Sequence, residues 1–394
     1  MNSAVLLCHP QPFPTESYLG YALRLSEKNG YNSPLELYRL AGVQKSYRRI
    51  GLDTATLARL TRGRPSDLQA ISYEPSNSSS TRVHLLSHQI ESKRLLLITA
   101  KLCPQCVAEK GFIEAHWDLK LMIGCPDHHR RAAVGCPKCS KRLPRFRPGL
   151  LECRCGGDIS KSDLATISSD AVKLLALIRS KVVGTSLSGG EFSILPYQEL
   201  LTMDLNHMLR SIEALGRRRL VVDNRPDAND EYQIICAAAQ VLKEWPTNFQ
   251  ALLRDIESQA SESTSLGVGH EFDSICDALF RIDRHYRPSG RAILFRDAFV
   301  EFATTTWEKG IASQALITRL RWLTSDRSMT VGEWATRAGV SLSTATRYWS
   351  KNGRQALLQY PRSRLSRVLV DGKDPVPGVA PKYSAVQLGI PIGY

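Results

Sequence analysis

The feature that most constrains the fold of this chain is a group of paired cysteines between residues 103 and 155. Seven of the ten cysteines, together with one histidine, fall into four pairs with the spacing of metal ligands. In a reducing compartment, closely spaced cysteines are more often metal ligands than disulfide partners. We therefore expect bound zinc to organise this segment.

The first group is Cys-Pro-Gln-Cys, then eighteen residues, then Cys-Pro-Asp-His. Two ligand pairs separated by a loop of this length place four nitrogen and sulfur donors at the corners of a tetrahedron, which zinc accepts. The predicted ligands are Cys103, Cys106, Cys125 and His128. The spacing leaves His129 open as an alternative to His128.

The second group follows at once, with a Cys-Pro-Lys-Cys pair, thirteen residues and a tighter Cys-x-Cys pair that relies on two glycines to relieve the turn. Its predicted ligands are Cys136, Cys139, Cys153 and Cys155. Each group supplies four protein ligands, which leaves no open position for water. The sequence thus predicts two structural zinc ions per chain.

Outside this segment, apolar periodicity and capping residues predict a mainly α, multi-domain protein. Helices are expected from Tyr18 to just before Asn29-Gly30, from Ser33, over Thr54–Thr61, from Ser66 to Ile71, over Ser169–Val182, and from Pro246 with Thr247 as its cap. No strong strand run is predicted outside the zinc module. The expected domains are an N-terminal helical domain (1–100), a double zinc-finger module (101–160), a helical domain (161–325), and a helix-turn-helix region with a C-terminal tail (326–394).

The charge of the chain favours a polyanionic partner. Lysines and arginines exceed acidic residues by 52 − 38 = +14, a surplus that attracts nucleic acid, although a basic but inert surface is the alternative. The sequence contains no apolar run of about 18 residues and no pattern typical of a signal peptide near Met1. We therefore expect a cytoplasmic protein without a membrane partner.

A helix-turn-helix is predicted over residues 330–349. Thr330 and Glu333 form a capping box, Gly339 makes the turn, and Ser341 caps the next helix. The residues expected to face outward, toward phosphates or base edges, are Ser343, Thr344, Thr346 and Arg347. The alternative is a helical corner with the same caps that serves only for packing.

Several of these motifs occur together in an order that resembles the TniQ family. They are Pro12, Pro14, Glu16-Ser17, Arg24-Leu25 and Asn29-Gly30, followed by Cys-Pro-x-Cys, Trp117, Cys-x-x-His and a further Cys-Pro-x-Cys. The resemblance covers about the first 160 residues. It implies a bacterial transposition protein that selects target sites, either by recognising DNA itself or by attaching to a CRISPR RNA-guided Cascade complex.

The second branch is the closer resemblance. It implies a non-enzymatic adaptor that works as a homodimer and links Cascade with its guide RNA to the transposon AAA+ ATPase regulator and transposase. An autonomous, sequence-specific DNA-binding target selector is the first alternative. A zinc-dependent hydrolase or nuclease is the second, but it needs an open metal position and a general base, and a packed role is favoured for His116. The guide complex, the target sequence and the dimer interface stay open.

Overall fold

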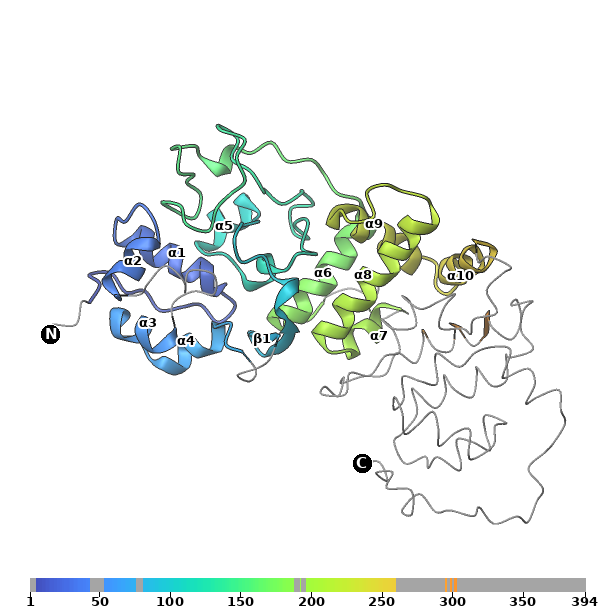
Figure 1. Ribbon diagram of the computed structural model, residues 1–394, viewed down its shortest axis with the longest axis horizontal. Coiled ribbons are helices and arrows are strands. Elements are labelled where there is room, and N and C mark those ends of the chain that lie inside the picture. The colour runs from blue at the N-terminus through green and yellow to red at the C-terminus, as the bar shows by residue number, and fades with distance from the viewer. Residues whose placement is uncertain are drawn as a thin grey trace, which may run out of the picture. The chain divides into compact units, whose positions relative to one another are not determined.

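The computed structural model describes residues 5–42, 53–75, 81–187, 192, 196–259, 295, 298–299 and 301–302. Over these residues the chain is mainly helical, as predicted (Figure 1). It divides into two compact units, Met1–Ser193 with Asp230–Ala239, and Ile194–Asn229 with Gln240–Tyr394. No helix in the described ranges is long and apolar enough to cross a membrane. The domain boundaries expected from the sequence remain predictions.

The first unit carries most of the short elements. They are α1 (Tyr18–Lys28), α2 (Leu35–Leu40), α3 (Thr54–Thr61), α4 (Pro65–Ile71), β1 (Arg82–Leu85), β2 (His88–Glu91), η2 (Ser92–Arg94), α5 (Pro104–Lys110), η3 (Ala115–Asp118), η4 (Ile159–Lys161) and α6 (Ser169–Val183). The second unit holds α7 (Tyr197–Thr202), α8 (Leu205–Val222) and α10 (Thr247–Gln259). The helix α9 (Glu231–Leu242) belongs mostly to the first unit.

Helix α1 begins and ends where the sequence predicts. The Ser17 hydroxyl caps its first turn by accepting a hydrogen bond from the Gly20 amide, and Tyr18 to Ser26 are buried. Asn29 ends the helix, and the next residue, Gly30, has φ +70°. Glycine adopts this left-handed conformation without a steric cost, so the chain can reverse there.

Three predicted helix starts are wrong by one residue. Helix α2 begins at Leu35 with Pro34 as its N-cap, so Ser33 lies before the cap. Helix α4 begins at Pro65 with Arg64 as its N-cap, so Ser66 lies inside the helix rather than before it. Proline suits the first turn because that turn has no intrahelical partner for its N–H group. Helix α10 likewise begins at Thr247 itself, which therefore does not act as the cap.

A short antiparallel hairpin, which the sequence did not predict, joins β1 to β2. Its register pairs Arg82 with Glu91 and Val83 with Ile90, and Leu86 turns the chain at φ +52°. Each strand has only four residues, too few for a period-two pattern to stand out in the sequence. Val83 and Ile90 are both buried, so the hairpin contributes to the core of its unit.

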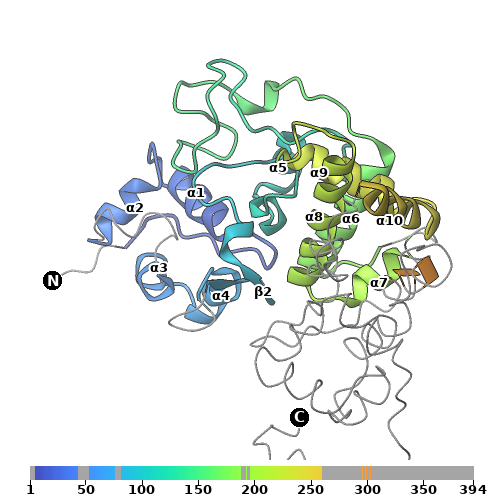
Figure 2. The same ribbon diagram turned by 45° about the vertical axis from the view of Figure 1, so that its right-hand side comes forward.

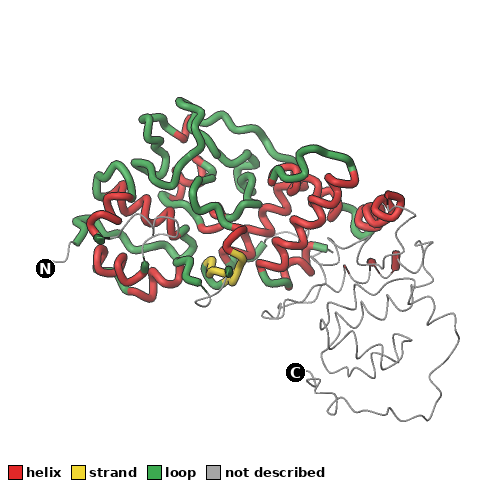
Figure 3. Tube along the Cα trace, in the orientation of Figure 1, coloured by secondary structure: helices red, strands yellow, loops and turns green. Residues whose placement is uncertain are grey.

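The cysteine-rich segment of the first unit is mostly loop (Figure 3). Isolated bridges hold it together, including Leu102 to Ala133 and Gly135 to Arg142. The segment is tied to α1, because the Ser17 amide donates to the Ile113 carbonyl at 2.8 Å. Helix α6 contacts η3, and α5 contacts η4; the helices α1 to α4 are seen from a second side in Figure 2.

In the second unit α8 packs against α10. An ion pair joins Arg219 of α8 to Asp255 of α10 at 2.7 Å. The ring of Phe249 stacks on Trp245, with centroids 5.1 Å apart, and meets Phe295 edge-on. The predicted helix-turn-helix at 330–349 lies outside the described residues.

Candidate metal centres

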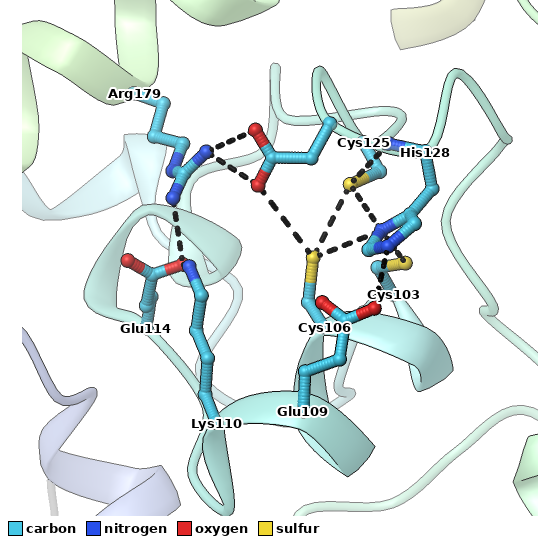
Figure 4. A network of polar contacts seen from close by, with 9 residues as sticks. Cys103, Cys106, Glu109, Lys110, Glu114, Cys125, His128 and Arg179 are labelled. Atoms are coloured by element: carbon cyan, nitrogen blue, oxygen red, sulfur yellow. Dashed lines mark hydrogen bonds and ion pairs between the residues drawn. The ribbon is translucent and has the colours of Figure 1, made fainter.

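The first ligand group gathers at the start of α5 and in the turn that follows Gly124. Cys103 is the N-cap of α5, and Cys106 lies in its first turn. The ligand atoms of Cys103, Cys106, Cys125 and His128 all lie within 4.8 Å of one another. His128 Nδ1 is 3.4, 3.3 and 3.4 Å from the sulfurs of Cys103, Cys106 and Cys125 (Figure 4).

The structure brings His128, and not His129, into this cluster. His129 is exposed and adopts φ +53°, and its amide donates to the Cys125 carbonyl at 3.0 Å. This hydrogen bond closes the turn that carries His128. The backbone of His129 thus shapes the site, while the imidazole of His128 supplies the donor atom.

Glu109 lies beside the first cluster, and the sequence analysis did not identify it. Its Oε1 is 3.0 Å from His128 Nε2, the ring nitrogen that faces away from the sulfurs. A carboxylate in this place accepts the Nε2 proton and leaves Nδ1 free to bind a metal. The available signal was its position on α5, three residues after Cys106, because such residues share a helix face.

A second set of charges outside the cluster also escaped the sequence analysis. Arg179 of α6 donates to both oxygens of Asp127 at 2.6 Å and lies 3.5 Å from Glu114. Lys110 also pairs with Glu114, at 2.6 Å (Figure 4). Asp127 Oδ2 is 3.9 Å from the Cys106 sulfur. These contacts connect α6 to the metal-ligating turn.

The second ligand group forms a separate cluster of four cysteines. The sulfurs of Cys136, Cys139, Cys153 and Cys155 lie within 4.8 Å of one another. The Lys138 amide donates to the Cys136 sulfur at 3.4 Å. A Cβ atom on Gly157 would lie 2.6 Å from that same sulfur, and Gly156 has φ +71°. Both glycines are therefore required by the turn, as the sequence analysis expected.

The donor chemistry of both clusters fits a metal ion of the zinc type. Thiolates and imidazole are the ligands that zinc prefers in four-coordinate sites. In the first cluster, hydrogen bonds from Cys106 and Cys125 lower the pKa of Cys103 to about 2, whereas the contact with Cys103 and burial raise the pKa of Cys125 to about 11. Three thiols this close resist full ionisation, and a divalent cation would relieve that repulsion.

His116 is a packed residue, as the sequence analysis favoured. It is fully buried, and its ring centroid lies 5.0 Å from that of Trp117. Burial, with smaller effects from Arg179 and Lys110, holds the pKa of His116 well below its usual value. The side chain is therefore neutral at physiological pH.

The polar residues of the N-terminal motif form a buried ion pair next to α1. Glu16 accepts hydrogen bonds from Arg24 Nε at 2.8 Å and Nη2 at 2.7 Å, and both side chains are buried. Arg24 Nη2 also donates to the Gln11 carbonyl at 2.9 Å. The pair thus holds the extended segment before α1 against the helix.

A second buried network connects Ser17 through Asp118 to Arg145, within the cysteine-rich segment. Asp118 Oδ2 accepts hydrogen bonds from the Ser17 hydroxyl at 2.5 Å and from the Tyr73 hydroxyl. Its Oδ1 pairs with Arg145 Nη2 at 2.5 Å, and Arg145 also donates to the carbonyls of Leu96 and Thr99. In sequence, Asp118 lies between the two ligand pairs of the first cluster, and Arg145 lies between those of the second. The network therefore joins the motif serine to the two loops that carry the clusters.

The predicted nucleic-acid-binding residues Ser343, Thr344, Thr346 and Arg347 lie outside the described residues. The eight predicted metal ligands, in contrast, all lie in the described part of the chain and fall into the two clusters.

Comparison with known proteins gives one family match. The TniQ family model matches residues 7–131, a range that includes α1, the first cysteine cluster and its connecting loop. No curated protein matches the chain. The matched range holds the motif residues Glu16, Ser17 and Arg24, whose contacts are described above. On this match, residues 7–131 are similar to the TniQ family.

Proposed function

We propose that this protein is a non-enzymatic targeting adaptor of a transposon. In this proposal it links a CRISPR RNA-guided Cascade complex, with its guide RNA, to the AAA+ ATPase regulator and the transposase, and it works as a homodimer that contacts DNA. The observation that carries the proposal is the TniQ match over residues 7–131. A match to that family implies a role in selecting transposition target sites.

The two cysteine clusters are proposed to hold one structural zinc ion each. The ligands are Cys103, Cys106, Cys125 and His128 at the first site, and Cys136, Cys139, Cys153 and Cys155 at the second. Four protein donors complete the coordination of zinc and leave no position for a substrate or an activated water. This closure supports a scaffolding role over a hydrolytic one.

The second candidate is an autonomous target selector that reads DNA sequence through the predicted helix at Ser341–Trp349. It would bind one duplex at least about a thousandfold more tightly than random DNA. Arg347→Ala would then remove roughly 1 to 3 kcal/mol of that preference. For the adaptor, we expect weak duplex binding that depends on salt and is nearly indifferent to sequence.

The test of the adaptor is co-purification of the full chain with candidate Cascade components, followed by extraction of bound RNA. We expect a stable complex that contains guide RNA. Recovery of the chain without Cascade, together with a footprint of the isolated protein at a single genomic site, would contradict the adaptor and favour the autonomous selector.

A further inference from the structure

The second cysteine cluster lies in a segment with an unusual charge. Residues 130–161 contain nine lysines and arginines and two acidic residues, a difference of 9 − 2 = +7. Residues 103–128, which contain the first cluster, have two basic and four acidic residues, a difference of 2 − 4 = −2. The net charge of the whole chain is +14. Half of it therefore comes from this one short segment.

Most of these cations are at the surface. Arg145 and Arg147 are buried and hold the fold together. The seven exposed ones are Arg130, Arg131, Lys138, Lys141, Arg142, Arg154 and Lys161. A zinc ion bound by four thiolates would carry a net charge of −2 and would offset only part of this surplus.

Most of the exposed cations contact neutral groups, while Lys161 interacts electrostatically with the Asp158 carboxylate. Arg130 donates to the Leu164 carbonyl, Lys138 to the Cys155 carbonyl, and Arg154 to the Phe146 carbonyl. The guanidinium of Arg131 lies 3.4 Å from the centroid of the Tyr232 ring. No ion pair joins any of the seven cations to a carboxylate within the described part of the chain. Their positive charge remains available to an external anion.

Two hairpin turns place several of these cations around the cluster. The Cys136 amide donates to the Lys141 carbonyl, and a β-bridge joins Gly135 to Arg142. Lys141 and Arg142 therefore lie on the strand of the turn that follows Cys139. Arg154 lies in the second turn, between the ligands Cys153 and Cys155. In Figure 1 the segment forms the loops drawn in teal to green above α5. Because loops carry these side chains, the bound metal would hold the cations in place.

We infer that the surface of residues 130–161, around the second cysteine cluster, is a docking surface for the phosphate backbone of duplex DNA. Single strands are bound mainly by aromatic platforms on which bases stack. The segment 130–161 has one aromatic residue, Phe146, and its ring meets Tyr38 edge-on at 5.8 Å. A surface with many cations and no free ring suits a duplex, whose bases are stacked internally and whose phosphates are exposed. The choice of DNA over duplex RNA rests on the proposed transposition function.

The test replaces Lys141 and Arg142 by glutamine in the full chain and measures binding to a short random-sequence DNA duplex over a range of salt concentrations. Both side chains are exposed, and neither has a recorded side-chain contact. Each phosphate contact contributes about 0.9 to the slope of log affinity against log salt, so the slope should fall by about 2. Between about 50 and 200 mM salt, the variant should lose about tenfold less affinity than the wild type.

The matched control is the pair Arg39→Gln and Arg64→Gln. These arginines are also exposed, but Glu36 and Asp67 already neutralise them at 2.7 and 3.0 Å. The control removes the same formal charge, and we expect an unchanged slope. Lys161→Gln, six residues after the last ligand, gives an independent variant that leaves the second cluster intact, with an expected fall of about 1.

Three outcomes would overturn the inference: an unchanged slope in both the Lys141/Arg142 double variant and Lys161→Gln, an equal fall in the control, or tighter binding of a single strand than of the duplex. The zinc content of the double variant shows whether it keeps its metal. If it does not, the slope of the Lys161→Gln variant is the test of the docking surface. Co-purification with Cascade is measured separately. If the protein co-purifies with Cascade but the variants have an unchanged slope, only the docking surface is contradicted. If the variants have the lowered slope but the protein does not co-purify with Cascade, only the adaptor function is contradicted.

Discussion

The two cysteine clusters of this protein have similar donors but lie in different surroundings. The first is built on a helix and is buried, with Cys103, Cys106 and Cys125 all nearly inaccessible. Carboxylates surround it, and Arg179 of α6 connects it to the rest of the unit. The second is built on two loop turns, and Cys155 is exposed.

The difference between them indicates a division of roles. A metal at the first site would hold α5 and the turn of Cys125 and His128 together, and Arg179 of α6 contacts Asp127 in that turn. A metal at the second site would hold only its own two turns, and it would leave their surface free for a partner. Two similar ligand patterns in one sequence can therefore have different roles: one metal site would stabilise the core, and the other would shape a surface.

The largest expected effect comes from removing one ligand at each site. Cys103→Ser should abolish the first metal and unfold much of the first unit, because structural zinc binding contributes on the order of 10 kcal/mol to the stability of small modules. Cys155→Ser should also lose one zinc ion but should leave the main unfolding transition in place. Thermal unfolding by circular dichroism, with metal analysis, measures both. Equal loss of stability in the two variants would contradict the division of roles.

The next effect concerns the buried network that joins the two regions. Asp118→Ala leaves Arg145 charged and unpaired in the interior, and such a loss costs about 3 to 5 kcal/mol. Asp127→Ala removes the half-exposed partner of Arg179 and is the control, with an expected cost of about 1 kcal/mol or less. Denaturant unfolding of both variants makes the comparison. Similar midpoints for the two would show that Asp118 does not join the regions.

The sequence predicts those features of the site whose residues lie close together along the chain. All eight ligands follow from short Cys and His pairs, and α1 follows from Ser17 and from Asn29-Gly30. The partners of those residues could not be predicted, because Asp118 lies 101 residues from Ser17 and Arg179 lies 52 residues from Asp127. Contacts over such distances depend on the tertiary fold, which leaves no periodic signal in the sequence.

Short elements were missed for a related reason. The β1–β2 hairpin has four residues in each strand, so its alternation of buried and exposed residues is too brief to distinguish from a loop. The starts of α4 and α10 were misplaced by one residue because Ser66 and Thr247 are both good caps, yet Pro65 and Pro246 shift the first turn. The choice between His128 and His129 likewise depended on the backbone, because the turn places the His128 imidazole beside the sulfurs and leaves His129 exposed.

A smaller effect on zinc affinity is expected from Glu109, which contacts a ligand of the first cluster rather than the metal itself. Glu109→Gln weakens the acceptor for His128 Nε2, and loss of such a contact reduces metal affinity by about 10- to 100-fold. Glu152→Gln, an exposed change next to the ligand Cys153, is the control and should leave zinc affinity unchanged. Competition with a zinc chelator measures both affinities. Equal zinc affinities for Glu109→Gln and the wild type would show that Glu109 does not position the imidazole.

The measurement that tests the central claim most directly is X-ray absorption at the zinc edge, combined with metal analysis of the purified full chain. The two clusters together supply seven sulfurs and one nitrogen. The expected result is two zinc ions per chain, each four-coordinate, with Zn–S distances of about 2.3 Å and a minor nitrogen shell at about 2.0 to 2.1 Å. One zinc ion or none, or an oxygen ligand that indicates an open position, would contradict two closed structural sites.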